Sequence, residues 1–209
     1  MTASTQRSTI VGPAGQIEIA RDEPVGASVG TAVIAHPHPL FGGAMDNKVT
    51  HTLARAFVQC GFTALRFNLR GVGASSGVHD EGRGETTDLL AVIDTLAPTG
   101  PLALAGFSFG AFVVTRSLAA LLPHRPLHSL VLVGTAAARF EVAQVPAQWN
   151  ERALVVHGEN DDTVPLAAAL DWARPQVLPV TVVPGGGHFF HGQLPLLKAL
   201  VMRHVRAVT

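Results

Sequence analysis

The stretch "PLALAGFSFGAFVVTRSLAALLP" (101–123) joins a strand pattern to a helix pattern through five residues. The run 101–107 is almost wholly apolar, which is typical of a strand buried on both faces of a parallel sheet. The run 108–123 has the apolar spacing of a helix. Between them stands "GFSFG" (106–110), a G-x-S-x-G string. At a strand-to-helix junction this string predicts a tight turn that lifts the Ser108 hydroxyl above the sheet, flanked by glycines because side chains there would collide with neighbouring backbone.

The rest of the chain alternates between the same two kinds of segment. Short apolar runs predict further strands at 31–36, 62–68, 127–134, 152–158 and 179–185, with an edge strand of alternating polarity at 15–21. Longer runs of helical spacing lie at 47–61, 84–98, 165–175 and 192–208. We expect a flexible tail at 1–9 and a loop or short cap at 135–151. The alternation predicts a single α/β domain over 1–209, with a doubly wound, mostly parallel sheet and helices on both faces.

Composition excludes several classes of protein. Of 209 residues, 47% are hydrophobic and 14% charged, which is too apolar for a disordered chain. The formal net charge is zero and no basic run occurs, so a nucleic-acid partner is disfavoured. With one cysteine, no uninterrupted apolar span and no signal-peptide pattern, we expect a cytoplasmic protein without a membrane span. The composition is compatible with either a monomer or a homodimer.

A serine nucleophile needs a base, and the base needs an acid to orient it. In a sheet of this kind functional side chains gather just beyond the carboxyl ends of the strands. Two such loops, "HGENDDTVP" (157–165) and "GGGHFFHG" (185–192), supply the residue types in the expected order of serine, acid and histidine. The candidates are Glu159, Asp161 and Asp162 for the acid, and His188 and His191 for the base.

The stretch "IAHPHPLFGG" (34–43) has two interpretations. His36 and His38 have the spacing of a chelating pair, but a catalytic metal needs a further ligand, and the residues that follow are Leu, Phe and Gly. We therefore expect no metal. The second interpretation is a loop that helps to bind the oxyanion formed during acyl transfer.

That second interpretation requires a backbone N–H from this loop, beside the N–H of Phe109 after the serine. Pro37 and Pro39 have no N–H, which leaves His38 first and Leu40 second as the predicted donors. Asp46 or Asn47 is placed to cap the next helix.

Five strings in the order of the chain resemble the motif loops of the α/β-hydrolases, in particular a small lidless esterase-like branch related to the dienelactone hydrolases. They are "HPHPLFGG", "RFNLRGVGASSG", "GFSFG", "HGENDDTVP" and "GGGHFFHG", spanning 31–192. The resemblance implies the α/β-hydrolase fold with little or no lid. It selects Asp161 through the family pattern G-x-x-D-x-x-V-P, and His188 as the base. Asp162 is expected to cap the helix that starts near Pro165. The resemblance further implies that Arg70 hydrogen-bonds to backbone.

The expected function is a serine hydrolase of small or short-chain carboxylic esters, with the triad Ser108, His188 and Asp161 and no cofactor. Phe41 and Phe189 are expected to line an apolar substrate pocket. A thioesterase or a peptidase with the same triad is an alternative. So are a metal-dependent hydrolase and a non-catalytic binding module on this fold.

Overall fold

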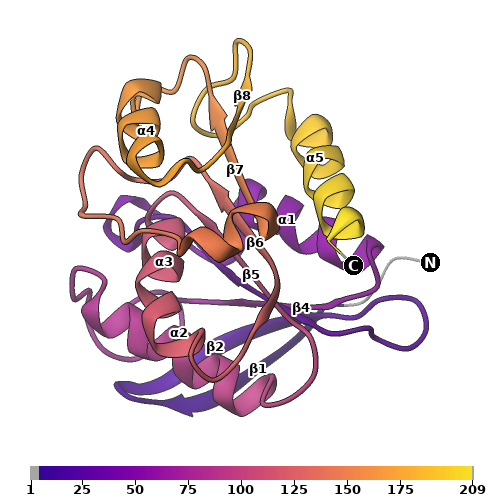
Figure 1. The fold of residues 1–209 in the computed structure, drawn as a ribbon. Helices are drawn as coiled ribbons and strands as arrows, with labels where there is room; N and C mark the ends of the chain where they lie inside the picture. The colour runs from indigo at the N-terminus through magenta and orange to yellow at the C-terminus, as the bar shows by residue number, and fades with distance from the viewer. Residues whose placement is uncertain (1–4, 209) are drawn as a thin grey trace.

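The computed structural model describes residues 5–208 and builds them into one eight-stranded sheet covered by helices (Figure 1). The pairings β1–β2 and β2–β4 are antiparallel, and the other pairings are parallel. The strand order is β1-β2-β4-β3-β5-β6-β7-β8. The strands are β1 (Gln6–Gly12), β2 (Gly15–Asp22), β3 (Thr31–Ala35), β4 (Thr63–Phe67), β5 (Leu102–Phe107), β6 (Leu127–Val133), β7 (Ala153–Gly158) and β8 (Val180–Val183).

The predicted parallel strands are all present with slightly shifted ends, but the N-terminal prediction is wrong in two respects. Residues 6–9, expected in a flexible tail, belong to β1, and residues 1–4 lie outside the described part of the chain. The strand expected at the edge, β2, lies between β1 and β4, and β1 is the edge. Because β1 is almost wholly exposed, it carries no apolar alternation by which the sequence could reveal it.

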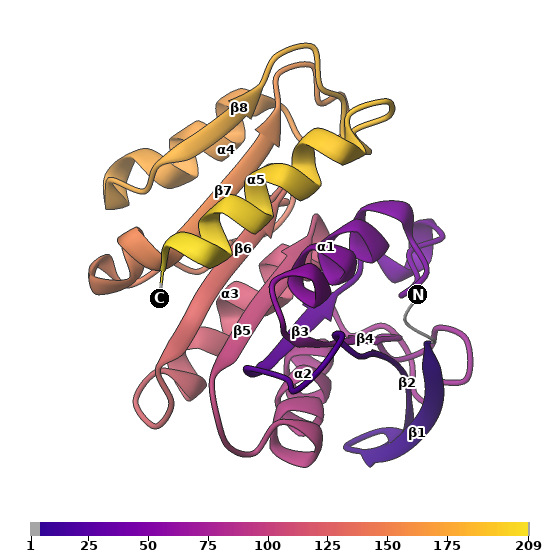
Figure 2. The same ribbon diagram turned by 90° about the vertical axis from the view of Figure 1, so that its right-hand side faces the viewer.

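Helices cover both faces of the sheet. In Figure 2, α1 (Lys48–Gln59) and α5 (Leu194–Ala207) lie in front, and the other three lie behind. Those three are α2 (Arg83–Leu96), α3 (Phe109–Leu121) and α4 (Leu166–Ala173). Each layer buries its own apolar cluster against the sheet, and this burial is the main stabilising term of the fold. No helix within residues 5–208 is long and apolar enough to cross a membrane.

The loop from β4 to α2, residues 68–82, is held by side chains. The Arg70 guanidinium donates to both carboxylate oxygens of Asp88, each at 2.8 Å. Arg70 was expected to bond to backbone, and this expectation is wrong. Gly84 permits the contact, because a Cβ there would overlap the guanidinium. Asp88 is therefore a buried ion-pair partner that fastens this loop to α2.

The connection between β6 and β7 has little regular secondary structure, as expected for 135–151. Its one helical element in the described chain is the 3-10 helix η2 (Ala147–Arg152). Phe140 and Trp149 pack against the core from this segment. The connection therefore covers one edge of the helical layer behind the sheet rather than forming a separate domain.

Candidate active site

Ser108 occupies the turn between β5 and α3 in a backbone conformation rare for a side-chain-bearing residue. Its φ and ψ are 55° and −114°, and its N–H donates to the Val133 carbonyl at 2.8 Å. A Cβ on Gly106 would meet the backbone of Gly110, and one on Gly110 would overlap the Ala35 carbonyl oxygen. The predicted reason for both glycines is confirmed. The strained turn holds the serine at the carboxyl end of the central strand.

Two hydrogen bonds connect Ser108 to residues far along the chain. The Ser108 Oγ lies 3.0 Å from His188 Nε2, and His188 Nδ1 lies 2.7 Å from Asp161 Oδ2. A carboxylate accepts from Nδ1–H, so Nε2 is the nitrogen free to accept the serine proton. All three side chains are buried, and Ser108 keeps 7% of its surface exposed. The three residues selected from the sequence thus meet in one chain of hydrogen bonds.

The Asp161 carboxylate is fixed on both oxygens. Its Oδ1 accepts from the N–H groups of Thr163 at 2.9 Å and Val164 at 2.7 Å. Burial raises the pKa of Asp161, but the hydrogen bonds from His188 and from the Val164 amide outweigh burial and hold the pKa below its ordinary value. The carboxylate is therefore charged at neutral pH and able to stabilise an imidazolium on His188.

The other acid-loop candidates serve elsewhere. Glu159 Oε2 accepts from the Gly185 N–H at 2.8 Å, which ties the two loops together. Asp162 is exposed, and α4 has no side-chain cap, so the expectation that Asp162 caps this helix is wrong. His191 is exposed ahead of α5.

The sequence analysis did not single out His157, which also belongs to the acid loop. Its ring is fully buried, and its Nε2 donates to the Val164 carbonyl at 2.8 Å.

The loops of Asp161 and His188 approach each other through a glycine. Gly158 ends β7, and a Cβ on it would overlap the Gly186 carbonyl oxygen of the neighbouring loop. The Asn160 N–H donates to that same carbonyl at 2.8 Å. The short distance between acid and base therefore depends on the missing side chain of Gly158.

His36 is a buried structural residue of the loop after β3. Its Nδ1 donates to the Pro37 carbonyl at 2.6 Å, and its Nε2 accepts from the Leu69 N–H at 3.0 Å. Burial lowers the pKa of His36 to about 4, although the Pro37 carbonyl acts in the opposite direction. Both ring nitrogens are engaged with backbone, so the ring joins the loop after β3 to the loop after β4.

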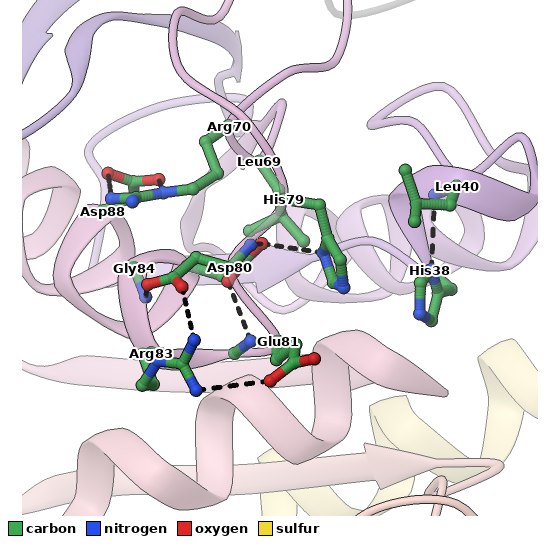
Figure 3. Close-up of polar contacts among 12 residues, drawn as sticks. His38, Leu40, Leu69, Arg70, His79, Asp80, Glu81, Arg83, Gly84 and Asp88 are labelled. Atoms are coloured by element: carbon green, nitrogen blue, oxygen red, sulfur yellow. Dashed lines mark hydrogen bonds and ion pairs between the residues drawn. The ribbon is translucent and has the colours of Figure 1, made fainter.

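The two predicted oxyanion donors, the N–H groups of His38 and Leu40, differ in whether they already donate a hydrogen bond within the protein. The Leu40 N–H donates to His38 Nδ1 at 3.2 Å (Figure 3). The Phe41 N–H donates to the His38 carbonyl at 3.2 Å. Within residues 5–208, the His38 N–H has no hydrogen-bond acceptor in the protein, and neither has that of Phe109 at the start of α3. Leu40 is thus committed to its own loop, whereas His38 and Phe109 each keep a donor available.

No group of three or more His, Cys, Asp or Glu side chains in the described chain is arranged to hold a metal ion. Two exposed aromatic side chains lie beside histidines of the motif loops. The Phe41 ring is 4.7 Å from the His38 ring, and the Phe189 ring is 5.1 Å from the His188 ring. Phe41 is 72% exposed and Phe189 42% exposed, whereas Phe107 and Phe112 are buried in the core. The site is therefore bordered by two apolar surfaces that reach solvent.

The chain is similar to known hydrolases. A family model described as serine aminopeptidase, S33, matches residues 33–151. A lidless α/β serine hydrolase from Xanthomonas campestris is 37% identical with a TM-score of 0.87, covering 99% of this chain and 96% of that one. An α/β serine hydrolase homologue from Coxiella burnetii is 36% identical with a TM-score of 0.83, covering 97% of each.

A third similar protein is an uncharacterized protein of Rickettsia prowazekii, which is 42% identical over 109 residues. The match covers 50% of this chain and 46% of the relative, so the chain spans about half the length of that curated relative.

Stability should depend on pH through His36. Between pH 6.5 and pH 4 the unfolded chain binds a proton that the folded chain does not, so stability falls as pH falls through this window. The full effect is about 3 kcal/mol, of which about 1 kcal/mol is lost between about pH 7.5 and about pH 5.5. Denaturant unfolding at these two pH values should show that His36→Gln removes this part of the dependence. Equal pH dependence in variant and wild type would contradict the assignment.

Gly158→Ala should separate the acid and base loops. We expect the hydrolase kcat to fall by about 100-fold, because small displacements of catalytic groups cost that much. Gly187→Ala is the matched control in the same region, since a Cβ there has only an ordinary contact with the Asn160 carbonyl at 3.9 Å. Steady-state kinetics of the two variants test this, and similar activities in both would count against the role given to Gly158.

Proposed function

Because the chain belongs to the α/β serine hydrolases of the serine aminopeptidase S33 family, we propose that it hydrolyses carboxylic esters of small or short-chain acids through an acyl-enzyme. The expected α/β-hydrolase fold is confirmed by the sheet order and by the two serine hydrolases that resemble the whole chain. One observation supports the proposal above the others. It is the hydrogen-bonded chain of Ser108, His188 and Asp161 at the strained turn after β5.

In the proposed reaction Ser108 Oγ attacks the ester carbonyl carbon while His188 Nε2 takes the serine proton. Asp161 keeps the proton of His188 on Nδ1 and stabilises the imidazolium that forms. The tetrahedral intermediate collapses as His188 returns its proton to the leaving alcohol. Water then attacks the acyl-enzyme with the same base, and Ser108 is regenerated.

The oxyanion of each tetrahedral intermediate would accept from the N–H groups of Phe109 and His38. Phe109 starts α3, so its N–H belongs to the unpaired first turn of a helix and adds the favourable end of the helix dipole. The His38 N–H is preferred to that of Leu40 because Leu40 already donates to His38 Nδ1. The two donors would stabilise the developing negative charge in a site partly screened from water.

The substrate class follows from the surfaces beside Ser108. The exposed rings of Phe41 and Phe189 would contact the apolar parts of an ester on either side of the reacting carbonyl. Within the described chain, the β6–β7 connection contains only the 3-10 helix η2, and its Phe140 packs beside His38 and Phe109. These exposed rings support a small ester with apolar groups as the substrate.

Peptide hydrolysis is the second candidate, because the matching family model is described as a serine aminopeptidase. An aminopeptidase must also bind a free α-amino group, which calls for a carboxylate near the site. Asp161 is already paired with His188, and the buried Glu85 already accepts from two backbone N–H groups. We therefore expect aminoacyl p-nitroanilides to be cleaved far more slowly than p-nitrophenyl esters at equal concentration.

Treatment with a fluorophosphonate, followed by peptide mapping, should find the label on Ser108. Ser108→Ala should lose the label and reduce esterase kcat by about 10⁴-fold or more, as expected when the nucleophile is removed. His191→Ala, which changes an exposed histidine of the base loop, is the control and should keep both label and activity. Folded wild-type protein that neither reacts nor hydrolyses esters would refute the proposal.

Phe41→Ala and Phe189→Ala should change preference among acyl chain lengths. Loss of an apolar contact weakens binding of the longer chains by roughly 1 kcal/mol, which corresponds to about a fivefold rise in KM for p-nitrophenyl hexanoate. The KM for the acetate ester should change by less than about twofold, because a methyl group buries little surface. If neither variant alters the chain-length profile, these rings do not form the substrate surface.

A further inference from the structure

His79 lies against the side chains of both proposed oxyanion donors. Its ring centroid is 4.8 Å from that of His38 and 5.3 Å from that of Phe109. The His38 and Phe109 rings are themselves 4.8 Å apart, so the three rings contact one another in pairs. His38 comes from the loop after β3 and Phe109 from the start of α3. His79 comes from a third segment, the loop before α2, and contacts both. Figure 3 shows His79 on this loop together with His38.

The His79 ring lies against a buried carboxylate. Glu85 is completely buried in the first turn of α2, and its oxygens accept from the N–H groups of Asp80 and Gly82, each at 2.8 Å. The Oε1 atom also lies 2.9 Å from His79 Nδ1. A buried carboxylate is stable only when it accepts from such donors, so the two N–H groups hold Glu85 to the backbone of this loop, and the edge of the His79 ring packs against it.

Hydrogen bonds and packing hold the loop that follows His79 in place. Asp80 accepts from the Gly84 N–H at 3.0 Å and from the Arg83 guanidinium at 2.8 Å (Figure 3). Glu81 and Gly82 follow with φ angles of 52° and 90°, a left-handed turn that leads directly into α2. A Cβ on Gly82 would overlap the Phe112 ring, so the turn is packed against α3. The loop that carries His79 therefore has little freedom to move relative to α3.

We propose that His79 is a positioning residue for the oxyanion hole. Its ring, which lies between Glu85 and the other two rings, packs His38 against Phe109 and thereby fixes the relative position of two N–H donors that belong to different elements. The inference rests on the proposed function, because it assumes that these two N–H groups bind the oxyanion. His79 takes no part in proton transfer. Its effect is geometric preorganisation, which stabilises the transition state more than the bound substrate.

The test compares His79→Ala, which removes the ring, with His79→Phe, which keeps a ring of similar shape. For p-nitrophenyl acetate, we expect His79→Ala to lower kcat about tenfold with KM changed by less than about twofold. Binding of phenylboronic acid, which forms a tetrahedral adduct on the serine, should weaken by the same factor as kcat/KM. His79→Phe should keep kcat within about threefold of wild type. His124→Ala, at an exposed turn after α3, is the matched control.

Three results would overturn the inference. They are an unchanged kcat in His79→Ala, an effect confined to KM, and a His79→Phe variant as impaired as His79→Ala. Circular dichroism and thermal unfolding check that each variant is folded, and His79→Ser replaces His79→Ala if the latter is not. Failure of the proposed function is distinguished by wild-type protein, which in that case neither reacts with fluorophosphonate nor hydrolyses the ester.

Discussion

The structure depends on the close contact between the first turn of α3 and the end of β3. A helix that begins one residue after Ser108 must run back past the sheet at once, and its second residue then meets the backbone of the neighbouring strand. Only glycine at position 110 fits, since any side chain would overlap the Ala35 carbonyl oxygen. The same contact places the Phe109 N–H beside the loop that begins at His36. One steric constraint therefore sets both the exposed serine and the space in which a substrate carbonyl can lie.

The remaining parts of the site are brought to this point by loops that approach one another through backbone. Gly158 lets the acid loop meet the base loop, and Glu159 and Asn160 then bond to the backbone of the base loop. On the other side, the buried His36 ring joins the loops after β3 and β4. Each loop that carries a functional side chain is thus bonded to or packed against a neighbouring loop or strand end. These contacts fix the positions of the functional side chains, although the site is built from loops.

The sequence predicts the part of this arrangement that local pattern encodes. Apolar periodicity identified the parallel strands and the helices, and G-x-S-x-G with its context identified Ser108. The choice of Asp161 over its two neighbours and of His188 over His191 required the family resemblance, because all five residues follow strands and have suitable chemistry. What the sequence did not reveal depends on contacts distant in the chain. Strand β1 is mostly exposed and lacks an apolar alternation. The contacts of His79 with His38 and Phe109 form only when the loop before α2 folds against α3 and the loop after β3.

The two ends of the sheet bear on how the protein behaves at high concentration. An open strand edge offers unpaired N–H and C=O groups to a strand of another molecule, and long apolar edges promote association. At one end, β1 presents polar and charged side chains, including Arg7. At the other, β8 is apolar, and Val182 is 36% exposed, but the strand has four residues and stands between Pro179 and Pro184. Because proline cannot donate to a strand ladder, these two residues limit the length over which a second chain could pair with β8.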